Sequence, residues 1–249
     1  MSLPLSVEDR LAVCTWSLQP ETPEALLAHL KTIGISKVQI ALDPIRENPA
    51  IWGRYGDLCR ESGISQVSGM MVTVGEDYST MEAIKETGGV VPDSTWPENL
   101  ANFKENILVA KDLGLKLVTF HAGFLPHEPS DPAFAKLMNR IRQIGELFGE
   151  NEMDLGFETG QETAETLKDF LDQLALPNVG VNFDPANMIL YDKGDPIEAL
   201  KVLAPYLKQC HIKDATRTVE AGQWGEEVQS GTGQVDWKDF FATLNQLQY

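Results

Sequence analysis

Three residues whose side chains could do chemistry stand at the ends of three short apolar segments. Glu158 lies in GFETG, Asp184 follows VNF, and His211 follows KQC. They are 26 and 27 residues apart, which is close to the length of one strand–helix unit. Side chains at the carboxyl ends of successive parallel strands converge on one site. We therefore expect these three residues to lie close together.

The three side chains are of the types that bind a divalent cation. Carboxylate oxygens and an imidazole nitrogen suit Mn²⁺, Mg²⁺, Co²⁺ or Zn²⁺, and a set without a thiolate argues against a structural zinc site. We expect Glu158, Asp184 and His211 to hold such an ion, with open positions for the oxygens of a substrate. Each residue also has an ordinary interpretation. An acid at a strand end is often only solvated, an isolated histidine is often packed, and Asp184 before Pro185 could be a turn former.

Further polar and aromatic residues at the predicted strand ends are candidates for binding a substrate. They are His121, Gln161, Asn187, Lys213 and Trp16. Trp16 would form an apolar wall, and the others would orient substrate oxygens. His127, in the loop beyond His121, is expected to be a solvated histidine.

Short apolar segments alternate with helical periodicities along the chain. The segments show little polar alternation, which is typical of parallel strands covered on both faces. No glycine-rich phosphate turn follows the first segment, so we expect an α/β fold of the (β/α)8 TIM-barrel type rather than a doubly wound sheet. Strands are expected at 11–18, 37–42, 64–72, 115–123, 153–160, 178–187 and 208–215, and helices at 22–34, 50–62, 97–113, 132–149, 162–174, 195–207 and 235–247.

Length, charge and cysteine usage limit the possible classes of protein. A chain of 249 residues fits a single TIM-barrel domain over residues 1–249. The formal net charge of −17 repels phosphate backbones, so we expect no nucleic-acid partner. Three widely spaced cysteines fit a reducing, cytoplasmic compartment. No apolar run approaches the roughly 20 residues of a membrane helix, so a membrane partner is not expected either.

Four segments, in this order, resemble the xylose isomerase-like TIM barrel family of sugar and sugar-phosphate isomerases and epimerases. They are FHAGFLP, GFETGQET, NFDPANMILY and HIKDA. The resemblance runs over nearly the whole chain, and endonuclease IV is a distant relative of the family. It implies that Glu158, Asp184 and His211 bind the metal ion, and that Glu158 also takes part in catalysis. It further implies a small carbohydrate as substrate and a homo-oligomeric assembly.

The sequence departs from the family pattern at its end. The family's fourth metal ligand is a glutamate on an eighth strand, whereas this sequence stops at LNQLQY, where the preceding helix should end. We therefore expect a barrel that lacks the eighth strand in this chain. Glu226 and Glu227, in the irregular stretch 216–234, are conceivable substitutes for the fourth ligand.

The preferred interpretation is a divalent-metal-dependent isomerase or epimerase of a small carbohydrate or related polyol. It would move a proton next to a carbonyl through an enediolate, with Glu158 as the catalytic base. A non-catalytic sugar-binding barrel, lacking the second glutamate, is the alternative. An endonuclease IV-type nuclease is a third hypothesis. It is disfavoured because that chemistry uses a histidine-rich zinc cluster, whereas this chain has four histidines and carries Asn187 where that pattern would place a histidine ligand.

Overall fold

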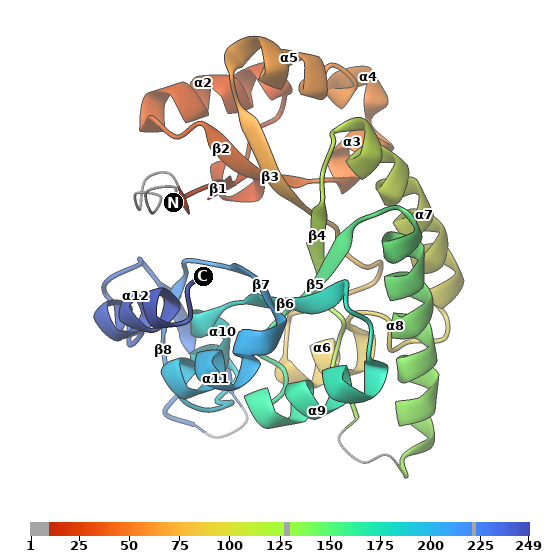
Figure 1. Ribbon diagram of the computed structural model, residues 1–249, viewed down its shortest axis with the longest axis vertical. Helices are drawn as coiled ribbons and strands as arrows, with labels where there is room; N and C mark the ends of the chain where they lie inside the picture. Colours follow the sequence, from red (N-terminus) through yellow and green to blue (C-terminus); the bar gives the residue numbers. More distant parts are fainter. Residues whose placement is uncertain (1–9, 127–129, 221–222) are drawn as a thin grey trace. The chain divides into compact units, whose positions relative to one another are not determined.

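The computed structural model describes residues 10–126, 130–220 and 223–249 (Figure 1). His127 lies outside the described residues, so its expected solvation is untested. The chain divides into two compact units, one made of residues up to 71 with 102–118, and the other of residues 72–101 with 119–249. The expectation of a single domain therefore stays a prediction.

The main sheet has seven strands whose order in the sheet is their order in the chain. Neighbouring strands pair in parallel, as the β1–β2, β2–β3, β5–β6 and β6–β7 registers show. Parallel strands in sequential order, joined by helices, define the TIM-barrel class and confirm the predicted α/β fold. Among the described residues this sheet ends at its seventh strand. The strands are β1 (Val13–Cys14), β2 (Lys37–Ala41), β3 (Ser65–Met70), β4 (Leu117–Phe120), β5 (Asp154–Glu158), β6 (Val179–Phe183) and β7 (Leu207–Cys210).

Helices precede and follow these strands at nearly all the predicted places. No helix in the described part of the chain is both long enough and apolar enough to span a membrane. The α-helices are α2 (Pro23–Ile33), α3 (Asp43–Glu47), α4 (Pro49–Trp52), α5 (Tyr55–Ser62), α6 (Met81–Thr87), α7 (Trp96–Asp112), α8 (Pro132–Glu150), α9 (Ala164–Leu174), α10 (Pro185–Leu190), α11 (Pro196–Leu203) and α12 (Trp237–Gln246), and the 3-10 helices are η1 (Thr15–Leu18) and η2 (Ala204–Tyr206).

In the first unit, β1 is much shorter than the predicted strand at 11–18. The strand ends at Cys14, and Thr15–Leu18 form η1 instead. The hydroxyl oxygen of Thr15, rather than a backbone carbonyl, accepts the hydrogen bond from the backbone N–H of Ala41 at 3.1 Å. The side chain thus replaces the next backbone contact of the ladder, and the chain is free to turn.

In the second unit, β5, β6 and β7 bring their carboxyl ends to one edge. Glu158 lies opposite Asn182, and Phe183 lies opposite Cys210. All five residues of β6 are buried, as expected for a strand covered on both faces. Gly180 is required there because a Cβ atom would stand 2.1 Å from the carbonyl oxygen of Tyr206.

Two predicted strands of this unit are wrong in their second halves. The strand expected at 178–187 ends at Phe183, and α10 begins at Pro185 with Asp184 as its N-cap. The strand expected at 208–215 ends at Cys210. Residues 214–216 instead form β8 (Asp214–Thr216), which pairs antiparallel with β9 (Glu226–Val228) in a separate two-stranded sheet.

Candidate metal centre

The second unit brings the three predicted ligands together. Glu158 is the last residue of β5, while Asp184 and His211 directly follow β6 and β7. The backbone N–H of His211 donates to the carbonyl of Phe183 at 2.8 Å, which continues the parallel register to the ligand itself. One ligand atom of each residue lies within 4.8 Å of the other two. We call Glu158, Asp184 and His211 the acidic cluster.

Asp184 is fully buried and has one oxygen already committed. Its Oδ1 accepts hydrogen bonds from the backbone N–H groups of Ala186 at 2.9 Å and Asn187 at 3.0 Å, as the N-cap of α10. Its own backbone N–H donates to the hydroxyl of Thr159 at 2.9 Å. These contacts fix the carboxylate and leave Oδ2 directed at the other two ligands.

Glu158, like Asp184, has one carboxylate oxygen that accepts a hydrogen bond and, in the described part of the chain, one that does not. It is 6% exposed, and its Oε1 accepts a hydrogen bond from Asn187 Nδ2 at 3.0 Å. Among the described residues, neither its Oε2 nor Oδ2 of Asp184 has a hydrogen-bond partner. Buried carboxylate oxygens without such partners are costly unless a cation lies nearby, and one does, because Lys213 Nζ is 3.0 Å from Asp184 Oδ2. Two such oxygens beside an imidazole are a donor set that fits a divalent metal ion.

The imidazole of His211 completes the set. Its Nδ1 lies 3.5 Å from Glu158 Oε1 and 3.7 Å from Asp184 Oδ2. The side-chain amide of Asn182 lies 3.1 Å from His211 Nε2, so a neighbour on β6 positions the ring. A metal-binding imidazole is normally oriented by a second polar partner of this kind.

Neighbouring charges favour the charged forms of Glu158 and Lys213. Burial acts to raise the pKa of Glu158, but the nearby His121, His211 and Lys213 together hold the pKa below its ordinary value. Burial acts to lower the pKa of Lys213, but the carboxylates of Asp184 and Glu158 raise it. The site therefore holds the ionised carboxylate of Glu158 and the ammonium group of Lys213 close together.

Four of the five predicted substrate-binding residues lie beside the acidic cluster. His121 places Nε2 at 3.4 Å from Glu158 Oε2, and its Nδ1 is 3.3 Å from Gln161 Nε2. Lys213 Nζ donates to Asn187 Oδ1 at 2.7 Å. Trp16 belongs to the first unit, on η1, so its role as an apolar wall stays a prediction.

The proposed substitutes for a fourth ligand lie outside the cluster. Glu226 and Glu227 are on β9, and Glu227 has a mostly exposed side chain whose Oε2 is 3.9 Å from Lys213 Nζ. Within the described ranges the group of potential ligands has three members. Glu227 thus faces the ammonium group of Lys213 rather than the position of an ion.

Sequence reasoning missed two tyrosines near the site. The ring of Tyr78 lies edge-on to His121, with ring centroids 6.3 Å apart, and the phenol of Tyr191 lies within the electrostatic influence of Glu158. Burial, with the charge of Glu158 as a further cause, raises the pKa of both phenols, so both remain neutral donors. Their signals were weak: Tyr78 lies in the irregular stretch 73–96, and Tyr191 closes the motif NFDPANMILY without a distinctive spacing.

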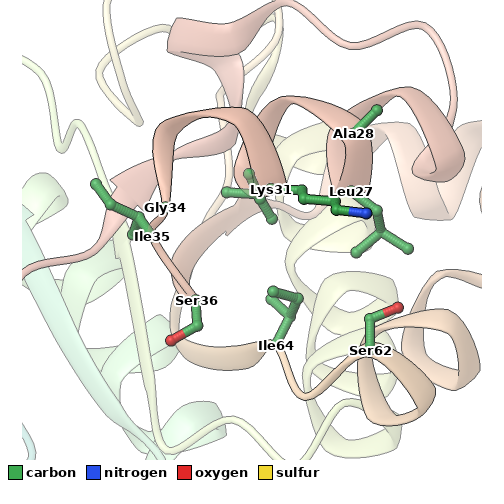
Figure 2. A pocket seen from close by; sticks show the side chains of 9 residues that line it. Leu27, Ala28, Lys31, Gly34, Ile35, Ser36, Ser62 and Ile64 are labelled. Carbon is green, nitrogen blue, oxygen red and sulfur yellow. The ribbon is translucent and has the colours of Figure 1, made fainter.

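The first unit contains a separate hollow with a volume of about 410 Å³ (Figure 2). Figure 2 shows Leu27 and Lys31 of α2 on one side of it and Ile64, which follows α5, on another. Its lining is largely aliphatic, with one ammonium group, and none of the lining residues belongs to the predicted site. The hollow therefore has no part in the metal centre.

The chain belongs to the xylose isomerase-like TIM barrel family, because residues 27–249 match the sequence profile of that family. The resemblance drawn from the four motifs is thereby confirmed. The solved structure of a xylose isomerase domain protein from Planctomyces limnophilus is 30% identical, with a TM-score of 0.87. That match covers 96% of this chain and 87% of the other.

Two further proteins are less similar to this chain. The structure of 3-keto-D-glucoside 4-epimerase from Escherichia coli has a TM-score of 0.72 over 96% of this chain and 88% of that chain. At 15% identity it shows likeness of fold alone. A curated relative, the uncharacterized protein YihM of Escherichia coli (strain K12), is 28% identical over 151 residues. The match takes in 59% of this chain and 46% of that protein, so it spans about half the length of this relative.

Proposed function

We propose that this chain is a divalent-metal-dependent isomerase or epimerase of a small carbohydrate or related polyol. The observation that carries the proposal is the acidic cluster, in which one ligand atom from each residue lies within 4.8 Å of the others. The buried oxygens Glu158 Oε2 and Asp184 Oδ2 support it, because they have no hydrogen-bond partner among the described residues. The family and its sugar-epimerase neighbours support the carbohydrate class.

Glu158 is the proposed base of the reaction. A bound divalent cation would polarise the carbonyl and a neighbouring hydroxyl of the substrate. Glu158 would take the proton from the carbon next to that carbonyl, since its carboxylate is ionised and its Oε1 is held by Asn187. The same carboxylate would deliver the proton to the neighbouring carbon of the enediolate, while the hydroxyl proton passes to the former carbonyl oxygen, to give the isomerised product.

Neighbouring side chains would orient the substrate. His121 is held at its Nδ1 by Gln161, which leaves Nε2 facing Glu158 Oε2 at 3.4 Å. In that position His121 would contact a substrate oxygen next to the carbon that loses its proton. The ring of Tyr78, edge-on to His121 and 45% exposed, would cover part of the same place and restrict the access of water to it.

A non-catalytic sugar-binding barrel is the second candidate. It is favoured by one observation: within the described ranges the cluster contains one glutamate, and Glu227 faces Lys213 instead of a second ligand position. An epimerase that works on both faces of a carbon needs a second proton donor. An aldose–ketose isomerase, which moves the proton to the neighbouring carbon on the same face, needs Glu158 alone for that transfer.

Proton exchange distinguishes these candidates. Purified protein is assayed for bound metal and then incubated in D₂O with candidate ketoses and aldoses. The proposal predicts deuterium at the carbon next to the carbonyl, and a loss of exchange of about a hundredfold or more in Glu158→Gln. Glu165→Gln, an exposed glutamate on α9, is the matched control and should exchange normally. Sugar binding without exchange would favour the non-catalytic candidate, and a metal-free protein that does neither would contradict both.

A further inference from the structure

Lys213 places its ammonium group among the predicted metal ligands. Its Nζ forms an ion pair with Asp184 Oδ2 at 3.0 Å, outside hydrogen-bonding geometry, and donates to Asn187 Oδ1 at 2.7 Å. The side chain is 26% exposed, whereas that of Asp184 is fully buried. Glu227 Oε2, 3.9 Å from Nζ, is a more exposed third neighbour.

Asn187 connects this ammonium group to the second carboxylate. Its Oδ1 accepts the hydrogen bond from Lys213, and its Nδ2 donates to Glu158 Oε1 at 3.0 Å. Both ends of the amide are thus used, which fixes its orientation. Lys213 contacts one carboxylate of the cluster directly and the other through a single amide. One cation therefore offsets part of the negative charge of a buried acidic pair that would otherwise be costly.

The oxygen that Lys213 approaches is the one that a metal ion needs. Oδ1 of Asp184 is committed to the backbone N–H groups of Ala186 and Asn187. The remaining oxygen, Oδ2, would bind a metal ion at roughly 2.0 to 2.2 Å. An ammonium nitrogen 3.0 Å from the same atom would then stand close to a divalent charge, and the two cations repel each other.

We propose that Lys213 is an internal cation that competes with the divalent ion for Asp184 and so lowers the affinity of the site for metal. The inference rests on the metal site of the proposed function. In the metal-free protein the ammonium group holds Asp184 directly and Glu158 through Asn187. Occupation of the site displaces the ammonium group from Asp184 Oδ2 and leaves it available to an oxygen of the substrate.

The test is a calorimetric titration with Mn²⁺ at fixed pH and ionic strength. Lys213→Met should bind Mn²⁺ at least about tenfold more tightly than the unchanged protein, because a nearby positive charge is removed. Lys208→Met is the matched control. Lys208 is a partly buried lysine that pairs with Asp154 Oδ2 at 2.9 Å, away from the cluster, and its replacement removes the same charge. The affinity of the Lys208→Met variant for Mn²⁺ should equal that of the unchanged protein.

A measurement on the unchanged protein removes any dependence on how the variant folds. Reductive methylation of lysines, followed by mass spectrometry, compares Lys213 with Lys208 in the presence and absence of Mn²⁺. Methylation of Lys213 should accelerate with the ion while that of Lys208 does not. Equal Mn²⁺ affinities with no change in methylation would contradict the competition alone. Absence of Mn²⁺ binding by all the proteins would contradict the metal site and the competition together.

Discussion

At the scale of single residues, the site depends on how each carboxylate divides its two oxygens. Asp184 gives Oδ1 to two backbone N–H groups, and Glu158 gives Oε1 to Asn187. The remaining oxygens, Glu158 Oε2 and Asp184 Oδ2, are buried. Glu158 Oε2 lies 3.4 Å from His121 Nε2, and Asp184 Oδ2 lies 3.7 Å from His211 Nδ1. The hydrogen bonds to one oxygen of each carboxylate fix the orientation of the other oxygen. The geometry of the site is therefore set before any ion binds.

Removing the charge of Asp184 should abolish metal binding while keeping the helix cap. Asparagine also caps helices, so Asp184→Asn should preserve the start of α10. We expect its affinity for Mn²⁺ to fall by more than about a hundredfold, beyond the effect of losing an outer-shell partner. Asp195→Asn is the control, because Asp195 caps α11 through the same two-N–H arrangement on the surface. Titration calorimetry of the two variants is the measurement, and a normal affinity in Asp184→Asn would rule out Asp184 as a ligand.

Glu162 predicts a pH dependence of stability. Burial is the main cause that raises the pKa of Glu162 to about 8, although its Oε1 accepts a hydrogen bond from the backbone N–H of Leu125. The folded pKa is above the unfolded value, so its stabilising contribution is complete below about pH 4. That contribution is lost as the pH rises through about 8.

The neutral variant Glu162→Gln should remove this part of the pH dependence. In the unchanged protein, the free energy of unfolding should fall by roughly 2 to 5 kcal/mol between pH 5 and pH 9 because of Glu162. Urea unfolding at several pH values should give a flatter profile for Glu162→Gln. Glu165→Gln, on the exposed face of α9, should keep the original slope. Parallel profiles for all three proteins would show that Glu162 ionises normally.

At the scale of elements, the sequence predicted the strand–helix units better than their ends. The interval between Glu158, Asp184 and His211 was sufficient to predict their convergence, because the unit that separates them repeats. The start of α10 was missed because Asp184 and Pro185 fit a turn as well as a cap followed by a first-turn proline. The β8–β9 pair could not be predicted, since it depends on a contact between Asp214 and Val228 across an irregular stretch.

Asp214 organises that irregular stretch. Its Oδ2 accepts hydrogen bonds from the N–H groups of Gly231, Gly233 and Trp237, and its Oδ1 accepts from Val235. Burial opposes its ionisation, but these donors lower the pKa of Asp214 below its ordinary value. A single carboxylate therefore connects β8 to the beginning of α12. It lies three residues after His211, so it also anchors the segment that carries His211 and Lys213.

Replacing this carboxylate with an amide should destabilise the protein. Asp214→Asn turns an N–H₂ group toward backbone N–H donors and leaves at least one of them without an acceptor. We expect a loss of about 2 to 4 kcal/mol in the free energy of unfolding, measured with urea. Asp236→Asn is the control. Asp236 accepts a single backbone N–H as the N-cap of α12, a role that asparagine can fill. Equal stabilities of the two variants would contradict the role of Asp214.

At the scale of the whole molecule, a protein with a net charge of −17 is stabilised by cations in two ways. One is general screening of charge repulsion, and the other is binding of an ion at one site. Any salt screens repulsion within an acidic protein and stabilises it somewhat. An ion bound in the acidic cluster stabilises the folded state further, by an amount that grows with its concentration above the dissociation constant. The family predicts such an ion, but the sequence alone could not show that two oxygens are left for it.

Thermal unfolding should reveal the specific part. Millimolar Mn²⁺ should raise the Tm of the unchanged protein by several degrees more than Na⁺ at equal ionic strength, on the order of 2–4 °C per kcal/mol of binding free energy. In Asp184→Asn the two salts should act alike. A similar Mn²⁺ effect in both proteins would mean that the ion acts only through general screening.

The most direct measurement is anomalous X-ray diffraction from crystals grown or soaked with Mn²⁺. The proposed centre predicts one strong anomalous peak between the three side chains. Its position should lie roughly 2.0 to 2.2 Å from Glu158 Oε2, from Asp184 Oδ2 and from a ring nitrogen of His211. The same peak should be absent from crystals of Asp184→Asn. A protein saturated with Mn²⁺ that shows its peak elsewhere, or none between these three side chains, would contradict the assignment of the site.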